Sequence, residues 1–307
     1  MDKKLTVVIP VYNRGDIVGR TLKSVEAQTL RPLRTVLVDN GSTDNSLDVL
    51  RLWRDRASGS DFEIDIVSEP HGKAAGARNA GLAITDTPWV MFFDSDDTMH
   101  PTHCSRAMDA VTPDTDVLGW NVNMHLPDGL RTGRFVGPNP HFDNIFHGGF
   151  ATQRWIARTD VVRKAGGWNP DALIWNDIEL GARIIESGAR IRRLSGHPTV
   201  DVYHSCQSIS TEPWQSRLSR METTLRLIEN TLPARYRHYT YYKAILAAGE
   251  AMRTSHDDAV RAKASRMYAE AIAKARSGGS RLLMNTTYNY IRHLERGSVT
   301  LLSFFIK

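Results

Sequence analysis

The most constraining stretch of this 307-residue chain covers residues 89–97 and reads Trp-Val-Met-Phe-Phe-Asp-Ser-Asp-Asp. Five consecutive apolar residues indicate a strand that is buried on both faces, as in a parallel sheet. Three carboxylates follow at once, so this strand delivers acidic groups that repel one another to the edge of the sheet. A hard divalent cation, Mg2+ or Mn2+, would compensate the repulsion and can also hold phosphate oxygens.

The same stretch also has a purely structural interpretation. Asp96 or Asp97 would then cap a helix that begins near Pro101, because acidic residues are common where a strand turns into a helix. The stretch alone supports both interpretations equally. The rest of the chain has to separate them.

Apolar and amphipathic runs alternate through the first hundred residues. The apolar runs, which are typical of strands, cover 5–11, 35–39, 63–68 and 89–93, and the helix-like runs between them cover 16–28, 42–53 and 74–84. This alternation predicts an α/β fold with a mostly parallel central sheet and helices on both faces. Ligands of such sheets bind beyond the carboxyl ends of the strands. Further along we expect strands over 116–124 and 199–203 and a hairpin turn at 127–129.

Composition narrows the class of protein. With 41% hydrophobic residues, the chain can bury one large core, or one core plus a helical appendage. Two cysteines, Cys104 and Cys206, give neither a disulfide framework nor a thiolate metal site, which is typical of a reducing compartment. The first apolar run is too short for a signal peptide, and no run approaches the roughly 20 apolar residues of a transmembrane helix. We therefore expect a cytoplasmic protein.

Charge changes sign along the chain. Residues 1–204 contain 23 basic and 26 acidic residues, whereas 205–307 contain 16 and 8, so the net charges are −3 and +8. We expect a helical appendage over 213–307. Its basic groups favour an anionic partner, such as the inner face of a membrane, which apolar residues of the helices would enter without crossing. Alternatively, those apolar residues pack on the catalytic domain or on a second subunit, and the basic groups face water.

Polar side chains collect where the predicted strands end. Tyr12 and Arg14 follow the first strand, Asp39 ends the second, and the acidic cluster ends the fourth. Tyr12 can stack on a base, and Asp39 can accept a hydrogen bond from a base N–H. Each of these residues could belong to an ordinary turn. Their convergence on one edge favours a nucleotide site.

An ordered set of motifs resembles the family 2 glycosyltransferases of the GT-A fold. The motifs are VIPVYN at 8–13, SVEAQ at 24–28, VDNGSTD at 38–44, ARNAG at 77–81 and DSDD at 94–97. The resemblance implies a metal-dependent and usually inverting transfer of a sugar from a nucleotide diphosphate sugar. We expect a GT-A catalytic domain over 1–212, with a nucleotide-binding half at 1–112 and an acceptor half at 113–212.

The resemblance also implies roles for individual residues. Asp96 would touch the metal, Mn2+ or Mg2+, and His204 would complete its shell as a neutral imidazole. His147 is a weaker candidate for contact with the acceptor. The residues expected to bind the nucleotide sugar are Pro10, Tyr12, Arg14, Asp39, Lys73, Arg78, Asp94 and Ser95.

Asp177 stands at the mouth of a predicted helix. Its spacing fits a helix N-cap as well as it fits a catalytic group. The family resemblance favours a catalytic base that takes the proton of an acceptor hydroxyl, with Glu179 as the neighbour that could take this role instead. Two positions depart from the family pattern, because Asn40 and Asn176 stand where acids are usual. The neighbouring acids, Asp39 before Asn40 and Asp177 after Asn176, are retained.

These features predict a hexosyltransferase that moves a sugar, from a UDP-sugar by preference, to a hydroxyl of a saccharide or lipid-linked saccharide. Such a reaction belongs to the synthesis of surface polysaccharides or glycoconjugates. The alternative is a catalytically weak protein that only binds nucleotide sugars or acts as a scaffold, which Asn40 and Asn176 make possible. A nicotinamide-dependent dehydrogenase is not supported, since no G-x-G-x-x-G follows the first strand. A nucleotidyltransferase would need a glycine-rich loop near residue 10. No nucleic-acid partner is expected.

Overall fold

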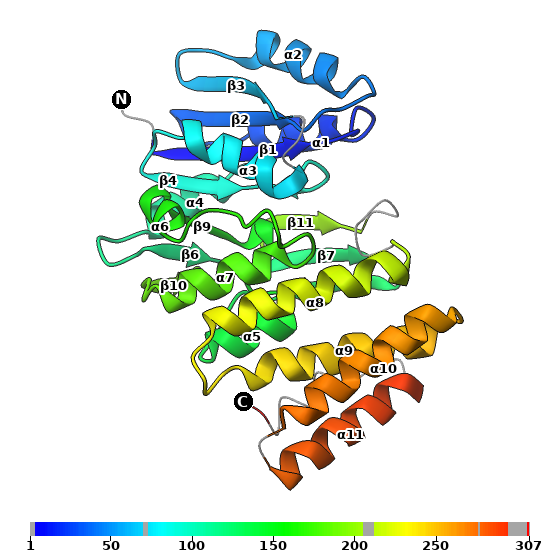
Figure 1. Ribbon diagram of the computed structural model, residues 1–307. Helices are drawn as coiled ribbons and strands as arrows, with labels where there is room; N and C mark the ends of the chain where they lie inside the picture. The colour runs from blue at the N-terminus through cyan, green and yellow to red at the C-terminus, as the bar shows by residue number, and fades with distance from the viewer. Residues whose placement is uncertain (1–3, 70–72, 205–211, 276, 294–305, 307) are drawn as a thin grey trace.

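The computed structural model describes residues 4–69, 73–204, 212–275, 277–293 and 306. Two sheets form its centre (Figure 1). The larger has seven strands in the order β10-β6-β9-β4-β1-β2-β3, and the smaller has four in the order β5-β11-β7-β8. The strands of the larger sheet are β1 (Leu5–Val11), β2 (Leu33–Asp39), β3 (Phe62–Ser68), β4 (Trp89–Phe92), β6 (Val117–Gly119), β9 (Trp155–Arg158) and β10 (Ile191–Arg193). Those of the smaller sheet are β5 (Thr98–Met99), β7 (Val122–Leu126), β8 (Gly129–Gly133) and β11 (Val200–Tyr203).

The larger sheet is mostly parallel, as predicted. Strands β3, β2, β1 and β4 are parallel neighbours, and β9 runs antiparallel between β4 and β6. Successive residues of β1 point to opposite faces, because Val7 and Ile9 belong to one apolar cluster and Val8 to another. Helices α1 (Val18–Glu26), α2 (Ser46–Ala57) and α4 (His103–Ala110) cover the first face, and α3 (Lys73–Ile84), α6 (Thr159–Lys164) and α7 (Asn176–Glu186) cover the second. The prediction of helices on both faces is confirmed.

The predicted single strand over 116–124 is wrong. The chain breaks at Trp120, so that β6 joins the larger sheet and β7 the smaller one. Trp120 donates its backbone N–H to the carbonyl of Arg154 at 2.8 Å and its indole N–H to that of Gln153 at 2.9 Å. Both bonds therefore end the β6–β9 pairing on a short 3-10 helix, η1 (Thr152–Arg154), which comes directly before β9. The predicted turn at 127–129 is confirmed by the β7–β8 hairpin.

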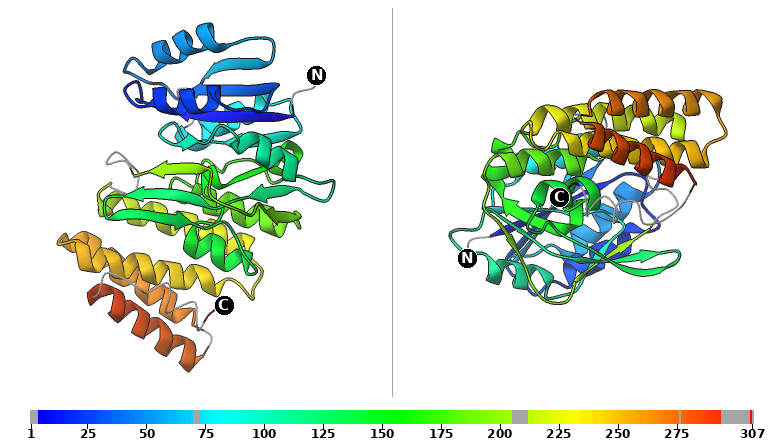
Figure 2. Two further views of the ribbon diagram at one scale, coloured as in Figure 1. Left: turned by 180° about the vertical axis from the view of Figure 1, so that it is seen from behind. Right: turned by 90° about the horizontal axis from the view of Figure 1, so that it is seen from below.

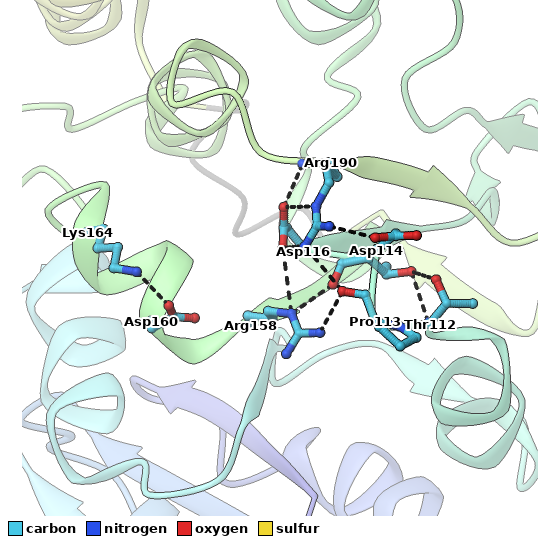
Figure 3. Close-up of polar contacts among 9 residues, drawn as sticks. Thr112, Pro113, Asp114, Asp116, Arg158, Asp160, Lys164 and Arg190 are labelled. Atoms are coloured by element: carbon cyan, nitrogen blue, oxygen red, sulfur yellow. Dashed lines mark hydrogen bonds and ion pairs between the residues drawn. The ribbon is translucent and has the colours of Figure 1, made fainter.

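Ion pairs join three strands at the edge of the larger sheet that lies opposite the acidic cluster (Figure 3). Asp116, just before β6, accepts hydrogen bonds at 2.9 Å from the backbone N–H and the guanidinium of Arg190. Arg158, at the end of β9, lies 3.6 Å from the same carboxylate. The hydrogen bonds from Arg190 lower the pKa of Asp116 to about 2. This network fixes the mutual alignment of β6, β9 and the segment before β10.

The four C-terminal helices lie together beside α7 (Figure 2). They are α8 (Trp214–Thr231), α9 (His238–Thr254), α10 (Asp258–Ala273) and α11 (Gly278–His293), and α5 (Pro140–His147) also contacts them. An apolar stripe of α8, which includes Leu218 and Met221, is buried in one cluster with Phe142 of α5 and Ile178 of α7. This packing supports the interpretation in which the stripe faces protein. Within the described ranges, no helix combines the length and the hydropathy needed to cross a bilayer.

Helix α3 approaches β1 closely at one glycine. A Cβ atom on Gly81 would lie 2.3 Å from Cγ1 of Val8, so only a residue without a side chain fits this position. Gly76, in the same helix, has open space around it, since the nearest atom to its Cβ position is 4.0 Å away. The close approach explains the glycine of the ARNAG motif.

We predict that Gly81→Ala lowers the free energy of unfolding by about 1–3 kcal/mol, because the added methyl group overpacks the contact with Val8. The matched variant Gly76→Ala should raise it by roughly 0.5–1 kcal/mol, since alanine has the better helix propensity. Denaturant unfolding measures both values. Equal effects of the two substitutions would contradict this account of the contact.

Candidate functional site

A cleft of about 1010 Å³ opens at the carboxyl ends of β1, β2 and β4. It brings together most of the residues predicted from the sequence. Asp39 and Asp177 do not line the cleft, but their neighbours Asn40 and Asn176 do. His147 does not line it either. The predicted residues that line the cleft are Pro10, Tyr12, Arg14, Lys73, Arg78, Asp94, Ser95, Asp96 and His204.

The two loops that follow β1 and β2 at the cleft are joined by hydrogen bonds. Asn13 has a left-handed backbone with φ 49°, and its N–H donates to Oγ of Ser42 at 3.1 Å. Its side-chain oxygen accepts from the N–H of Thr43 at 2.8 Å. Asp39 is buried and accepts from the N–H of Ser42 at 3.3 Å. The exposed ring of Tyr12 therefore projects from a fixed loop, where a base can stack on it.

The acidic cluster after β4 is held by donors from three other elements. Arg78 of α3 donates to Asp94 at 2.8 Å, and the side-chain amide of Gln153 donates to the other oxygen of Asp94 at 2.7 Å. The same amide also donates to Asp97, whose second oxygen accepts from the N–H of Tyr203 at 2.9 Å. The cluster does not cap a helix, because β5 follows it and α4 begins only at His103. The N-cap interpretation of this stretch is wrong.

Asp97 is the most deeply buried member of the cluster. It is 1% exposed, and burial, followed by the charges of Asp94 and Asp96, raises its pKa to about 8. A proton on Asp97 at neutral pH removes one of three like charges. Burial and the charge of Asp94 also raise the pKa of Asp96, against the opposing charges of Arg14 and Arg20.

The side chains of this cleft include groups that suit a divalent cation bound jointly by the protein and a substrate. Among the described residues, no three His, Cys, Asp or Glu side chains form a cage for a metal. Asp96 and His204 nevertheless face one cleft and offer a carboxylate and an imidazole, which suit Mn2+ or Mg2+. Such ions commonly take only one or two protein ligands and complete their shell with phosphate oxygens and water. The residues present therefore fit a cation that is bound together with a diphosphate.

Arg78 is a buried cation of this cleft with unpaired donors. Its side chain is buried against the ring of Trp168, with the guanidinium carbon 4.5 Å from the ring centre. One nitrogen binds Asp94, while Nε and Nη1 have no hydrogen-bond partner in the described part of the chain. Buried guanidinium donors are costly to leave unpaired. A ligand with several acceptor oxygens would satisfy them.

Helix α7 carries the predicted acid Asp177 directly after Asn176, which lines the cleft. It begins at Asn176, and Trp175 is its N-cap, so the interpretation of Asp177 as an N-cap is wrong. Burial raises the pKa of Asp177, against the opposing charges of Arg78 and Arg154. Glu179 is buried and forms an ion pair with Arg183 at 2.6 Å. Of the two acids, Glu179 is therefore committed to a structural contact.

Comparison with known proteins relates the N-terminal part of the chain to one family. Residues 6–146 match glycosyl transferase family 2. This part of the chain belongs to that family. The uncharacterised glycosyltransferase YibD of Escherichia coli is 29% identical over 189 residues, a match that covers 57% of this chain and 51% of YibD. The chain thus spans about half the length of this curated relative.

Solved structures of low identity share the fold, which is of the GT-A type. TarS 1–349 of S. aureus in complex with UDP-GlcNAc superposes with a TM-score of 0.74 at 16% identity, covering 94% of this chain and 87% of that one. The mannosyltransferase PcManGT of Pyrobaculum calidifontis, in complex with GDP-Man and Mn2+, gives a TM-score of 0.59 at 16% identity, covering 99% and 88%.

Several residues of the site carry no motif in the sequence. Gln153 bridges Asp94 and Asp97, yet it lies in the short 3-10 helix η1 with no motif around it. Glu212 and Arg220, which form an ion pair at 2.7 Å, line the cleft from the helical region. The sequence shows that α8 carries basic residues, but it does not show that Arg220 faces the cleft.

We predict that Asp97 makes the unfolding free energy fall as the pH rises from about 4 to about 8. The unfolded chain loses this proton near 3.8, whereas the folded protein keeps it until about pH 8. The folded state thus binds more protons over this interval, and raising the pH favours unfolding. In Asp97→Asn this contribution disappears, so the variant gains stability relative to wild type with rising pH.

Urea unfolding in EDTA at several pH values measures this slope. Asp61→Asn, at an exposed position, is the control and should leave the slope unchanged. Parallel pH profiles for wild type and Asp97→Asn would show that Asp97 is already ionised at low pH.

Proposed function

We propose that this protein transfers a sugar from a nucleotide diphosphate sugar to a hydroxyl acceptor with inversion at the anomeric carbon. The observation that carries the proposal is the pairing of Asp94 with Arg78, whose remaining donors are unpaired, in a cleft that also contains Asp96. The match of residues 6–146 to glycosyl transferase family 2 supports the reaction class.

The donor would lie along the carboxyl ends of β1 and β4. Tyr12 stacks on the base, and Asp39, beside the cleft-lining Asn40, accepts from a base N–H. Arg14, Lys73 and Arg78 supply positive charge to the diphosphate. A uracil nucleotide is favoured, which the structural likeness to TarS in its complex with UDP-GlcNAc supports.

A divalent cation, Mn2+ or Mg2+, would be held by Asp96 and His204 together with the donor diphosphate. When bound, it would neutralise negative charge on the departing nucleoside diphosphate. The likeness to PcManGT, whose structure contains GDP-Man and Mn2+, supports this assignment. Asp94 then serves mainly to fix Arg78, since both of its oxygens already accept hydrogen bonds.

Asp177 acts as the general base in this proposal. It accepts the proton of the acceptor hydroxyl while that oxygen forms a bond to the anomeric carbon, and the bond from this carbon to the diphosphate oxygen breaks. Its raised pKa makes it a better proton acceptor than an exposed aspartate. A single displacement inverts the configuration at the anomeric carbon, and no covalent intermediate with the protein is formed.

The acceptor would be a saccharide or lipid-linked saccharide used in surface polysaccharide or glycoconjugate synthesis. The cytoplasmic location and a peripheral membrane contact stay predictions. Because the apolar stripe of α8 packs on α5 and α7, such a contact would have to use the basic outer surface of the helical region.

The test of the proposed function is the release or transfer of sugar from a panel of UDP-, GDP- and dTDP-sugars in the presence of Mn2+. Turnover of one donor supports the proposal. Binding of a nucleotide sugar without turnover, even with acceptors added, would instead support the alternative of a binding or scaffold protein.

We predict that Asp96→Asn abolishes Mn2+-dependent binding of UDP, because it removes the charged ligand of the cation. His204→Ala should weaken the same binding less, since water can replace a neutral ligand. Calorimetric titration of UDP with and without Mn2+ measures the effect. UDP affinity that is unchanged in Asp96→Asn would remove Asp96 from the metal site.

We predict that Asp177→Asn binds the donor almost normally and loses roughly 10²–10⁴-fold in kcat, because only the proton acceptor is removed. Glu179→Gln should instead lower thermal stability, since it breaks the buried ion pair with Arg183. Initial rates and melting temperatures separate the two roles. A folded but inactive Glu179→Gln, together with an active Asp177→Asn, would transfer the catalytic role to Glu179.

A further inference from the structure

The turn that leads into α7 has an unfavourable backbone conformation. Trp175 has φ 55° and ψ 30°, the left-handed region that bulky residues rarely adopt. Such a conformation persists only where the surrounding structure enforces it. Asn176, which lines the cleft, and Asp177 follow directly, so the direction of this turn decides where the proposed base lies.

Helix α8 holds the backbone on one side of the turn. Thr224 is fully buried, and its hydroxyl donates to the carbonyl of Ile174 at 2.8 Å. Other threonines of the same helix behave differently, because the hydroxyls of Thr223 and Thr231 donate to carbonyls of α8 itself. Thr224 therefore directs its hydrogen bond out of its own helix, to the residue that precedes the strained one.

Helix α9 holds the side chain of the same turn. The ammonium of Lys243 lies 4.8 Å from the centre of the Trp175 ring, within the range of a cation–π contact. It makes no hydrogen bond or ion pair with any described residue. Burial lowers the pKa of Lys243 to about 8, against the opposing charges of Asp177 and Glu250. A partly desolvated cation strengthens the contact with the ring.

We propose that Thr224 and Lys243 are positioning residues, which hold Trp175 in its left-handed conformation and thereby set the position of Asp177. The C-terminal helices would then be a working part of the acceptor side of the cleft. The catalytic consequence rests on the proposed function, in which Asp177 is the base. The conformational part does not, because it concerns only the turn.

Hydrogen–deuterium exchange tests the conformational part without any substrate. The N–H of Glu179 donates to the carbonyl of Trp175 at 3.0 Å and so reports on the first turn of α7. Thr224→Val, which removes the hydroxyl at similar size, should accelerate amide exchange in a peptide covering residues 174–180. Thr224→Ser should restore slow exchange. Thr223→Val is the matched control from the same helix and should match wild type.

Steady-state kinetics test the catalytic part on the full chain. Thr224→Val should lower kcat by up to about 10²-fold, with little change in KM for the donor, because a misplaced base affects the chemical step. Thr224→Ser should recover the activity. A fall in donor affinity together with kcat would instead indicate general damage to the fold and would overturn the proposal.

Lys243 provides a second variant that does not depend on the folding of Thr224→Val. Lys243→Met should lower kcat and accelerate exchange in the same peptide, and Lys243→Arg should preserve both, since a guanidinium also stacks on an indole. Lys274→Met is the matched control, because Lys274 lies 4.9 Å from the ring centre of Tyr241, away from the turn.

Wild-type exchange rates at 174–180 in both Thr224→Val and Lys243→Met would overturn the proposal. Failure of the proposed function would give a different result, because the wild-type protein would then turn over no donor. The exchange experiment would still test the conformational part, since it needs no substrate.

Discussion

The structure depends on how the repulsion among three acidic side chains at the end of β4 is compensated. Asp94, Asp96 and Asp97 lie where a buried strand meets the cleft, and each compensating donor comes from a different part of the chain. Arg78 belongs to α3, Gln153 to η1, and the backbone N–H opposite Asp97 to β11. Because these elements are distant in sequence, the cluster can form only when both sheets are assembled. The acidic cluster therefore couples the larger sheet to the smaller one.

The helical region is continuous with the rest of the protein in its packing. Its apolar residues form one buried cluster with α5 and α7, so that the face of α7 turned away from the central sheet is completed by α8 and α9. Helix α7 thus lies between two apolar clusters and begins at the cleft. In the proposed function, the N-terminal strands would present the donor and the later helices would present the acceptor side.

Local and nearly local patterns in the sequence predicted the parallel sheet, its flanking helices and nine of the residues that line the cleft. The sheet and the helices follow from hydrophobic periodicity, whereas the cleft residues follow from motifs at strand ends and from the resemblance to family 2 glycosyltransferases. The break at Trp120, the bridging amide of Gln153 and the proton on Asp97 were not predictable. Each depends on partners tens of residues away, which only the folded chain brings together. The same reason explains the wrong prediction that Asp177 could be a helix N-cap. Trp175, two residues earlier, takes that position.

The paired loops of Asn13 and Ser42 have a consequence for the nucleotide recognition that we propose. Because Asn13 already bonds Ser42 and Thr43, an arriving base would meet a surface whose backbone freedom was lost during folding. Binding there carries little additional ordering entropy. Discrimination among bases must then come from shape and from matched hydrogen-bonding groups, because a rigid rim cannot remodel itself around a mismatched ring. Enlarging the range of accepted bases would accordingly require loosening this rim, with a loss of affinity for every base.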